Sequence, residues 1–252
     1  QYPYTASSTT LSTLLPGWVL TDGEDSVKAR LQKQEIRNRV TEYMLSKLKQ
    51  RKLKHYSYAV VANYKTDTSF NGKSIEQVNL LMKRKHTAAE ETKTVMDMVM
   101  NGSASMIFHG MSEDDVLRII QYSFNMPASD ASIRVFGEGN PHPRGYGTNA
   151  RVLAKYVHDE KLFSLEEAVR RMTSLPAQKF HLEGRGLLLP GFAADIIVFD
   201  FDEVKDLSVY DKPHQYSTGF RYVIVNGKIT MQNGALTGVR NGEIMYGEGK
   251  KM

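Results

Sequence analysis

The chain has 252 residues and 41% hydrophobic content, enough for one large α/β domain or a large domain with a small appendage. It contains no cysteine, which excludes disulfides, thiolate metal sites and cysteine nucleophiles, so any metal must be held by His, Asp or Glu. The net charge of +5 is concentrated in Lys and Arg at positions 28–54. We interpret these as a solvated helix face, because no stacking aromatics or groove-reading motif accompany them to favour a nucleic acid or another polyanion.

Helix signals recur along the chain. An apolar stripe at helical spacing predicts one long charged helix over residues 27–48. Another helix is predicted over residues 148–160. Other helices are predicted to begin at capping pairs or at a cap followed by acids: Ser74 with Gln77, Thr87 with Glu90, Ser164 with Glu167, and Ser112 before Glu113, Asp114 and Asp115. The sequence contains neither a membrane-spanning apolar run nor a leader pattern, and its first residues are typical of the interior of a domain.

Short β-type runs lie between these helices, at residues 56–61, at residues 105–108 and on the approach to Ala128. Such alternation favours βα units and a parallel sheet, in which functional groups gather at the carboxyl ends of strands. Asp130 falls at such a position. After residue 184 the sequence changes to strands and turns, and residues 225–228 predict a type I′ hairpin. We therefore predict two parts, residues 1–184 and residues 185–252.

Asp130 and Arg144 are the strongest candidates for chemistry. Asp130 could act as a general base or a metal ligand, or it could simply cap a helix. The loop before Arg144 is stiffened by Pro141 and Pro143, and a fixed guanidinium suits a substrate carboxylate. An ordinary surface ion pair explains Arg144 equally well, so both interpretations stay open.

The seven histidines show neither a His-x-His pair nor a His-Glu-x-x-His arrangement, so a complete zinc site is not predicted. His109 follows a predicted strand and is the best isolated ligand candidate, although a lone histidine is more often structural. The opening segment YPYTASSTT supplies hydroxyl groups that could orient a polar substrate or cap a turn. There is no nucleophile elbow and no phosphate-binding glycine loop, which disfavours serine hydrolysis and nucleotide hydrolysis.

Several motifs together resemble one family, the D-aminoacylases, which are the N-acyl-D-amino-acid deacylases of the amidohydrolase superfamily. The resemblance covers nearly the whole chain. In order, the motifs are YPYTASST, MSEDDV, ASD, NPHPRGYGTNARVLAKYV, SLEEAVRRMTSLPAQKF, RGLLLPGFAADIIVFD and YVIVNG. The spacing from ASD to HPRGYGT is the most specific part, because the later motifs are shared by many amidohydrolases.

The resemblance implies an α/β fold: residues 1–184 would be the later part of a (β/α)8 barrel, and residues 185–252 strands of a small β-sandwich. It implies zinc-dependent hydrolysis of the amide of N-acyl-D-amino acids. Asp130 matches the aspartate that takes a proton from the metal-bound water and passes one to the leaving nitrogen. Arg144 matches the arginine that grips the substrate carboxylate, and Tyr2 and Ser8 match hydroxyl partners in that pocket.

The metal ligands are where this chain departs from the family pattern. The family's His-x-His pair and further ligands precede the segment that matches Gln1, and a barrel cannot close with only its later strands. We therefore expect zinc to be held mainly by residues outside this chain, in a missing N-terminal half that acts as its partner, and the chain alone to be inactive. Alternatives are a D-dipeptidase, an N-acyl-D-glutamate deacylase, a cyclic-amide hydrolase or a non-catalytic scaffold subunit.

Overall fold

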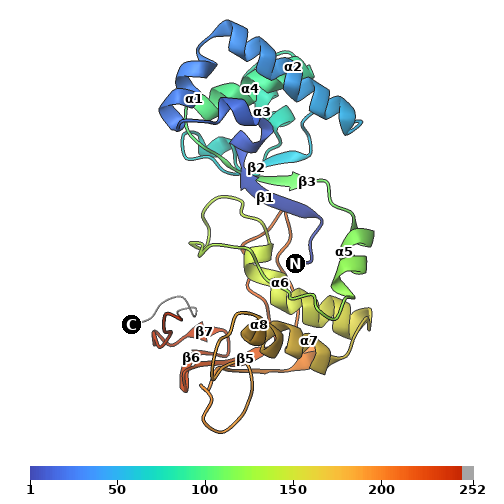
Figure 1. The fold of residues 1–252 in the computed structure, drawn as a ribbon, viewed down its shortest axis with the longest axis vertical. Coiled ribbons are helices and arrows are strands. Elements are labelled where there is room, and N and C mark those ends of the chain that lie inside the picture. The colour runs from blue at the N-terminus through green and yellow to red at the C-terminus, as the bar shows by residue number, and fades with distance from the viewer. Residues whose placement is uncertain (246–252) are drawn as a thin grey trace.

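The computed structural model describes residues 1–245, which form two lobes with a small sheet between them (Figure 1). The upper lobe in Figure 1 is helical and is inserted between the first and third strands of that sheet. The lower lobe holds the later helices and a second sheet. The amino terminus lies between the two lobes, close to the small sheet.

The helical lobe packs four α-helices around an apolar core. Its elements are η1 (Leu11–Leu14), η2 (Gly17–Val19), α1 (Glu24–Leu31), α2 (Gln34–Gln50), η3 (Thr68–Phe70), α3 (Ile75–Leu81) and α4 (Ala88–Met100). Fully buried side chains on α1, α2 and α4, such as Leu31, Met44 and Met96, meet in one cluster. Two helices, α1 and α2, occupy the span of residues 27–48 for which one long helix is predicted, so the prediction of a single continuous helix was wrong. The apolar spacing lengthens to five residues between Leu31 and Ile36, and the chain turns there.

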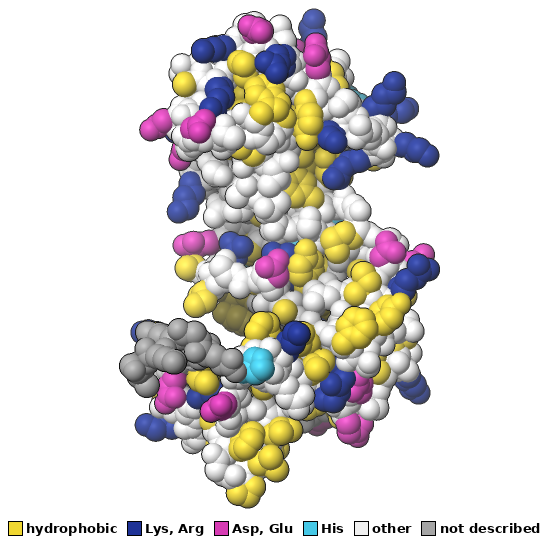
Figure 2. Space-filling view, in the orientation of Figure 1, with side chains coloured by type: hydrophobic (Ala, Val, Ile, Leu, Met, Phe, Trp, Pro, Cys, Tyr) yellow, Lys and Arg dark blue, Asp and Glu magenta, His cyan; other side chains and the backbone are white. Residues whose placement is uncertain are grey.

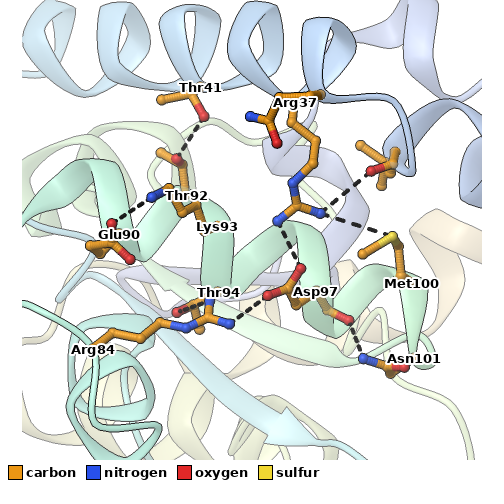
Figure 3. Close-up of polar contacts among 12 residues, drawn as sticks. Arg37, Thr41, Arg84, Glu90, Thr92, Lys93, Thr94, Asp97, Met100 and Asn101 are labelled. Atoms are coloured by element: carbon orange, nitrogen blue, oxygen red, sulfur yellow. Dashed lines mark hydrogen bonds and ion pairs between the residues drawn. The ribbon is translucent and has the colours of Figure 1, made fainter.

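A polar network ties α2 to α4 across this core (Figure 3). Asp97 on α4 accepts hydrogen bonds from Arg37 on α2, at 2.8 Å, and from Arg84 in the loop before α4. The Thr41 and Thr92 hydroxyls meet at 3.1 Å between the same two helices. Because Asp97 is mostly buried, its charge needs both guanidinium partners.

The small sheet has the order β1-β3-β2, with β1 at Ala6–Thr10, β2 at Ala59–Asn63 and β3 at Ser105–His109. Two of the predicted strands are therefore confirmed, with shifted ends for the first. Both pairings are antiparallel, so the parallel sheet expected from helix and strand alternation is wrong for these strands. Alternation of helices and strands along the sequence does not fix strand direction. The helices between β1 and β3 are long enough for the chain to enter β3 from the end at which β1 stops, which makes the two strands antiparallel.

The lower lobe is built from α5 (Glu113–Ile120), α6 (Arg144–Arg151), the π-helical segment η4 (Val152–Asp159), α7 (Leu165–Met172) and α8 (Ser174–Lys179). The helix predicted over residues 148–160 is present and begins earlier, at Arg144. Buried side chains of α5, η4 and α7, including Val116, Tyr156 and Ala168, form its core. All four predicted caps are present, and Ser74 and Gln77 make the complete reciprocal capping box.

The second sheet has the order β4-β5-β6-β7 and is antiparallel throughout. Its strands are β4 (Ile196–Phe199), β5 (Phe220–Val225), β6 (Lys228–Gln232) and β7 (Ala235–Leu236), and η5 (Phe201–Glu203) follows β4. The predicted hairpin joins β5 to β6, with Asn226 and Gly227 both at positive φ, as a type I′ turn requires. The mixed helix and sheet content is as expected, whereas the barrel, the sandwich and the boundary after residue 184 stay predictions.

Large hydrophobic side chains are exposed on the second sheet. Figure 2 shows hydrophobic side chains at the surface of both lobes. On β4, Ile197 is 55% and Val198 is 43% exposed, although neighbouring residues of a strand point to opposite faces. Strand β4 therefore exposes apolar side chains on both faces, and no other strand within residues 1–245 pairs with its outer edge. Within residues 1–245, none of the helices combines the length and apolarity that crossing a membrane needs.

Candidate functional site

Arg144 and Asp130 face each other at the start of α6. The Nη2 atom of Arg144 lies 2.9 Å from Oδ2 of Asp130, so the loop does bring the predicted carboxylate and guanidinium together. The Arg144 side chain is 8% exposed and the Asp130 side chain is 69% exposed. Asp130 has φ +48°, an uncommon conformation for a non-glycine residue and a costly one to hold.

The guanidinium of Arg144 is enclosed by the first residues of the chain. Its Cζ atom lies 4.3 Å from the centre of the Tyr2 ring, and Nη2 donates a long hydrogen bond of 3.5 Å to the Ser8 carbonyl oxygen. The other terminal nitrogen, Nη1, is buried without a hydrogen-bond partner among the described residues. A buried donor on a charged group carries a large desolvation cost, so this atom is suited to an incoming acceptor.

The structure thus brings together all four residues that the sequence singles out, with one correction. Asp130 does not follow a strand: residues 126–128 pair with no strand in the described chain, and their two backbone hydrogen bonds both go to Gln1. Ser8 contacts the Arg144 guanidinium through its backbone carbonyl oxygen. The roles assigned to these residues by resemblance stay predictions.

His142 is a positioning residue in this arrangement. Its Nε2 atom lies 2.9 Å from the Ala6 carbonyl oxygen and donates to it, while Nδ1 accepts from the Arg144 backbone N–H at 3.0 Å. These two bonds define a neutral imidazole that links β1 to the start of α6. Burial lowers the pKa of His142 to about 4, against a smaller opposing effect of the bond to Ala6. With both nitrogens engaged, His142 is not available as a metal ligand or base.

Behind His142 lies a group of polar residues centred on Tyr4 and Asp206, most of which the sequence did not reveal. The Tyr4 hydroxyl donates to Oδ2 of Asp206 at 2.9 Å, and Arg151 lies 3.5 Å from the same oxygen. The Tyr210 ring packs edge-on against both Tyr4 and His142. Burial raises the pKa of Tyr4 and of Tyr210 above the ordinary value for tyrosine, so both hydroxyls stay protonated. No short motif links positions 4, 151, 206 and 210, which explains why the sequence did not reveal them.

The residues around Asp130 do not by themselves provide a metal centre. His109 ends β3, as predicted, but its ring packs against Tyr210, 4.7 Å between centres, and burial lowers its pKa. Within residues 1–245, the group of three or more ligating side chains that could surround one ion lies elsewhere, in the helical lobe. Arg144 can bind a carboxylate through its unpaired Nη1 donor, and Asp130 presents a second carboxylate beside it. A zinc ion at Asp130 would need ligands from outside this chain.

Comparisons with known proteins find similar sequences and solved structures. Residues 124–231, which include Asp130 and Arg144, match the amidohydrolase family. The chain is 40% identical to a D-aminoacylase of Alcaligenes xylosoxydans xylosoxydans over 159 residues, 63% of this chain and 32% of that protein. It also resembles a crystal structure of D-aminoacylase, with a TM-score of 0.69 and 29% identity, covering 96% of this chain and 41% of the other.

A further solved structure is similar over most of the chain. It is N-acyl-D-glutamate deacylase from Bordetella bronchiseptica, complexed with zinc and a phosphonate that mimics the tetrahedral intermediate. The TM-score is 0.66 at 28% identity, over 91% of this chain and 38% of that protein. The resemblance to D-aminoacylases is thereby confirmed. The chain spans well under half the length of each of these relatives.

Proposed function

We propose that this chain, a relative of the D-aminoacylases, is the part of a metal-dependent amidohydrolase that binds the carboxylate of an N-acyl-D-amino acid and supplies a proton-transfer group for hydrolysis of its amide. Arg144 binds the substrate carboxylate, and the Tyr2 ring and the Ser8 carbonyl hold the guanidinium in place. Asp130 removes a proton from the attacking water and delivers one to the leaving nitrogen.

The observation that supports this most strongly is the state of Arg144. A mostly buried guanidinium has one nitrogen on Asp130 and another with no acceptor. A carboxylate bound through both terminal nitrogens would satisfy the unpaired donor and compete with Asp130 for Nη2. Substrate binding would then release the Asp130 carboxylate from its ion pair, which leaves it available for proton transfer.

The proposed reaction needs a metal ion, and we propose zinc without assigning its ligands to this chain. Zinc would be held mainly by residues of a complementary N-terminal portion, because the described residues near Asp130 do not form a ligand set. The need for such a partner is supported by the shares of 32% and 41% that the chain covers in its relatives, and by the uncovered strand β4. Without that portion, we expect the chain to bind substrate poorly and not to turn it over.

The test uses the enzyme assembled with its N-terminal portion and compares two single variants. Asp130→Asn keeps the shape of the side chain and removes its proton-accepting charge, so kcat should fall about 10²-fold to 10⁴-fold. Arg144→Ala should raise KM by about 10-fold to 100-fold, the loss expected for hydrogen bonds to a charged group.

The control is a substrate whose carboxylate is replaced by an amide. The Arg144→Ala variant and the wild type should process this substrate with similar KM values, because it lacks the group that Arg144 binds. Full activity of Asp130→Asn, or an unchanged KM of Arg144→Ala for the acid substrate, would reject the assigned roles. Far-ultraviolet circular dichroism of each variant would exclude unfolding as the cause of a loss.

A second candidate substrate is an N-acyl-D-glutamate, favoured by the similarity to the Bordetella bronchiseptica deacylase, which is nearly equal to that to D-aminoacylase. A panel of N-acyl-D-amino acids with apolar and acidic side chains, compared by kcat/KM, separates the two. D-dipeptides and cyclic amides belong in the same panel. Turnover of none of them by the assembled, metal-loaded protein would favour the scaffold interpretation.

A further inference from the structure

Four ligating side chains converge in the helical lobe, away from the elements that carry Asp130 and Arg144. They come from four separate places: His55 in the loop between α2 and β2, Glu76 in the first turn of α3, His86 in the loop between α3 and α4, and Glu91 in the first turn of α4. One ligating atom of each lies within 4.8 Å of the corresponding atoms of the other three.

The contacts within this cluster alternate between imidazole and carboxylate. Nδ1 of His55 lies 2.5 Å from Oε1 of Glu91 and 3.8 Å from Oε1 of Glu76. Nε2 of His86 lies 2.6 Å from the same Glu76 oxygen. The remaining oxygen of Glu91, Oε2, accepts a hydrogen bond of 2.7 Å from the Tyr56 backbone N–H. That outer contact fixes the carboxylate so that Oε1 points to the cluster centre, as the outer hydrogen bonds of metal ligands do.

The two carboxylates of the cluster have no Lys or Arg partner. The Glu91 side chain is completely buried, and within residues 1–245 no Lys or Arg forms an ion pair with Glu76 or Glu91. The rings of His55 and His86 are stacked with centres 4.3 Å apart, so both imidazoles lie beside the two carboxylates. Buried charges in proteins are paired or coordinate metals, and one divalent cation among the four groups would balance the two carboxylate charges.

We propose that His55, Glu76, His86 and Glu91 form a binding site for a divalent transition metal, with zinc the best fit. Two imidazole nitrogens and two carboxylate oxygens are a donor set that zinc accepts in tetrahedral sites, at about 2.0–2.2 Å from the metal. Ligand atoms in such a tetrahedron lie about 3.3 Å from one another. The separations of 2.5, 2.6 and 3.8 Å bracket that value and all ligand atoms lie within 4.8 Å of one another, so binding requires shifts of about 1.5 Å or less, which the exposed His86 can make most easily.

The role that follows is structural. The site joins the first turns of α3 and α4, the loop between them and the loop that leads into β2. All four positions are filled by protein side chains, and such closed zinc sites stabilise folds without activating water. The metal would therefore hold the helical lobe together and would not take part in amide hydrolysis.

The experiment is a metal titration of the 252-residue chain after dialysis against a chelator. Cobalt(II) serves as the spectroscopic probe, because tetrahedral coordination gives it intense visible absorption, and zinc then displaces it. We expect one equivalent of zinc to bind to this site and to raise the midpoint of thermal unfolding. His86→Ala and Glu76→Gln should each weaken zinc binding by at least about tenfold, in the range found when ligand-supporting residues are lost.

His158→Ala is the matched control. His158 is also a partly exposed histidine, and it lies 2.8 Å from a carboxylate oxygen of Asp159, but it is not part of the cluster. This variant should bind zinc like the wild type. Equal affinity in wild type and His86→Ala, or no tetrahedral cobalt spectrum, would overturn the proposal. If His86→Ala is less stable than the wild type, its unfolding midpoint is measured with and without zinc. Loss of the site removes the increase in midpoint that zinc causes, whereas general destabilisation does not.

Discussion

His142 joins the first strand to the helix that carries Arg144, and it makes both bonds as a neutral ring. Its pKa is lowered to about 4 in the folded chain from an ordinary value of 6.5. Between pH 6.5 and about pH 4 the unfolded chain binds a proton at His142 that the folded chain does not. The contribution of neutral His142 to the free energy of unfolding is therefore fully present above pH 6.5 and is lost as the pH falls. At pH 5 we expect a loss of about 2 kcal/mol from this residue.

The measurement is the free energy of unfolding from urea titrations at pH 7.5 and pH 5. His142→Gln removes the titrating group, so its stability should fall less over this interval than that of the wild type, by about 2 kcal/mol. Other histidines contribute equally to both proteins and cancel in the comparison. Identical pH dependence in the two proteins would show that His142 is not buried in its neutral form.

Helix α6 depends on a close approach that only glycine permits. A Cβ atom added to Gly147 would lie 1.8 Å from Oδ1 of Asp206 and 2.6 Å from the Tyr4 hydroxyl oxygen, whereas one on Gly145 meets only Ala131 Cβ, at 3.5 Å. Gly147→Ala should therefore destabilise the chain by about 1–3 kcal/mol, because the bond between Tyr4 and Asp206 must shift.

Gly145→Ala is the matched change on the same helix. It should be neutral or stabilising by up to about 1 kcal/mol, because alanine favours helix and the site is open. Thermal or urea unfolding of both variants makes the comparison. If the two alanine variants were equally stable, the tight packing between α6 and the segment that holds Asp206 would be wrong.

Elements with local signals could be predicted from the sequence, and those set by distant contacts could not. The cap of α3 and the turn between β5 and β6 each depend on a few neighbouring residues, and both were predicted correctly. The direction of β3 relative to β1 depends on the path of the chain through the helical lobe between them, and no local sequence pattern encodes that path. The strand expected before Asp130 failed because a strand needs a neighbour to bond with.

The same distinction applies to the sites of the whole molecule. Asp130 and Arg144 lie close together in the sequence around stiff proline and glycine turns, so their proximity could be predicted. The histidines and glutamates of the proposed zinc site come from four segments without a short ligand motif, and only the packing of α3, α4 and the loop before β2 brings them together. The Tyr4 and Asp206 contact, between residues near opposite ends of the chain, is equally invisible to sequence spacing.

Strand β4 gives the whole molecule an uncovered, apolar edge. Its residues Ile197 and Val198 are exposed on opposite faces, and no described strand pairs with its outer edge. Such an edge is a template for pairing with another chain, which a lysine prevents. We expect the isolated chain to self-associate as its concentration rises, and Ile197→Lys to reduce this association in sedimentation velocity experiments.

Ile133→Lys is the control, because Ile133 is fully exposed but lies in a loop outside any strand. It removes an apolar side chain and adds the same charge, so it separates edge pairing from a general effect of charge or hydrophobicity. Association that is reduced by Ile197→Lys and not by Ile133→Lys assigns the contact to β4. If the N-terminal portion that we propose as partner covers this strand, the assembly of the two should show no concentration-dependent association through it. Persistent association there would mean that β4 is not the surface on which the two portions meet.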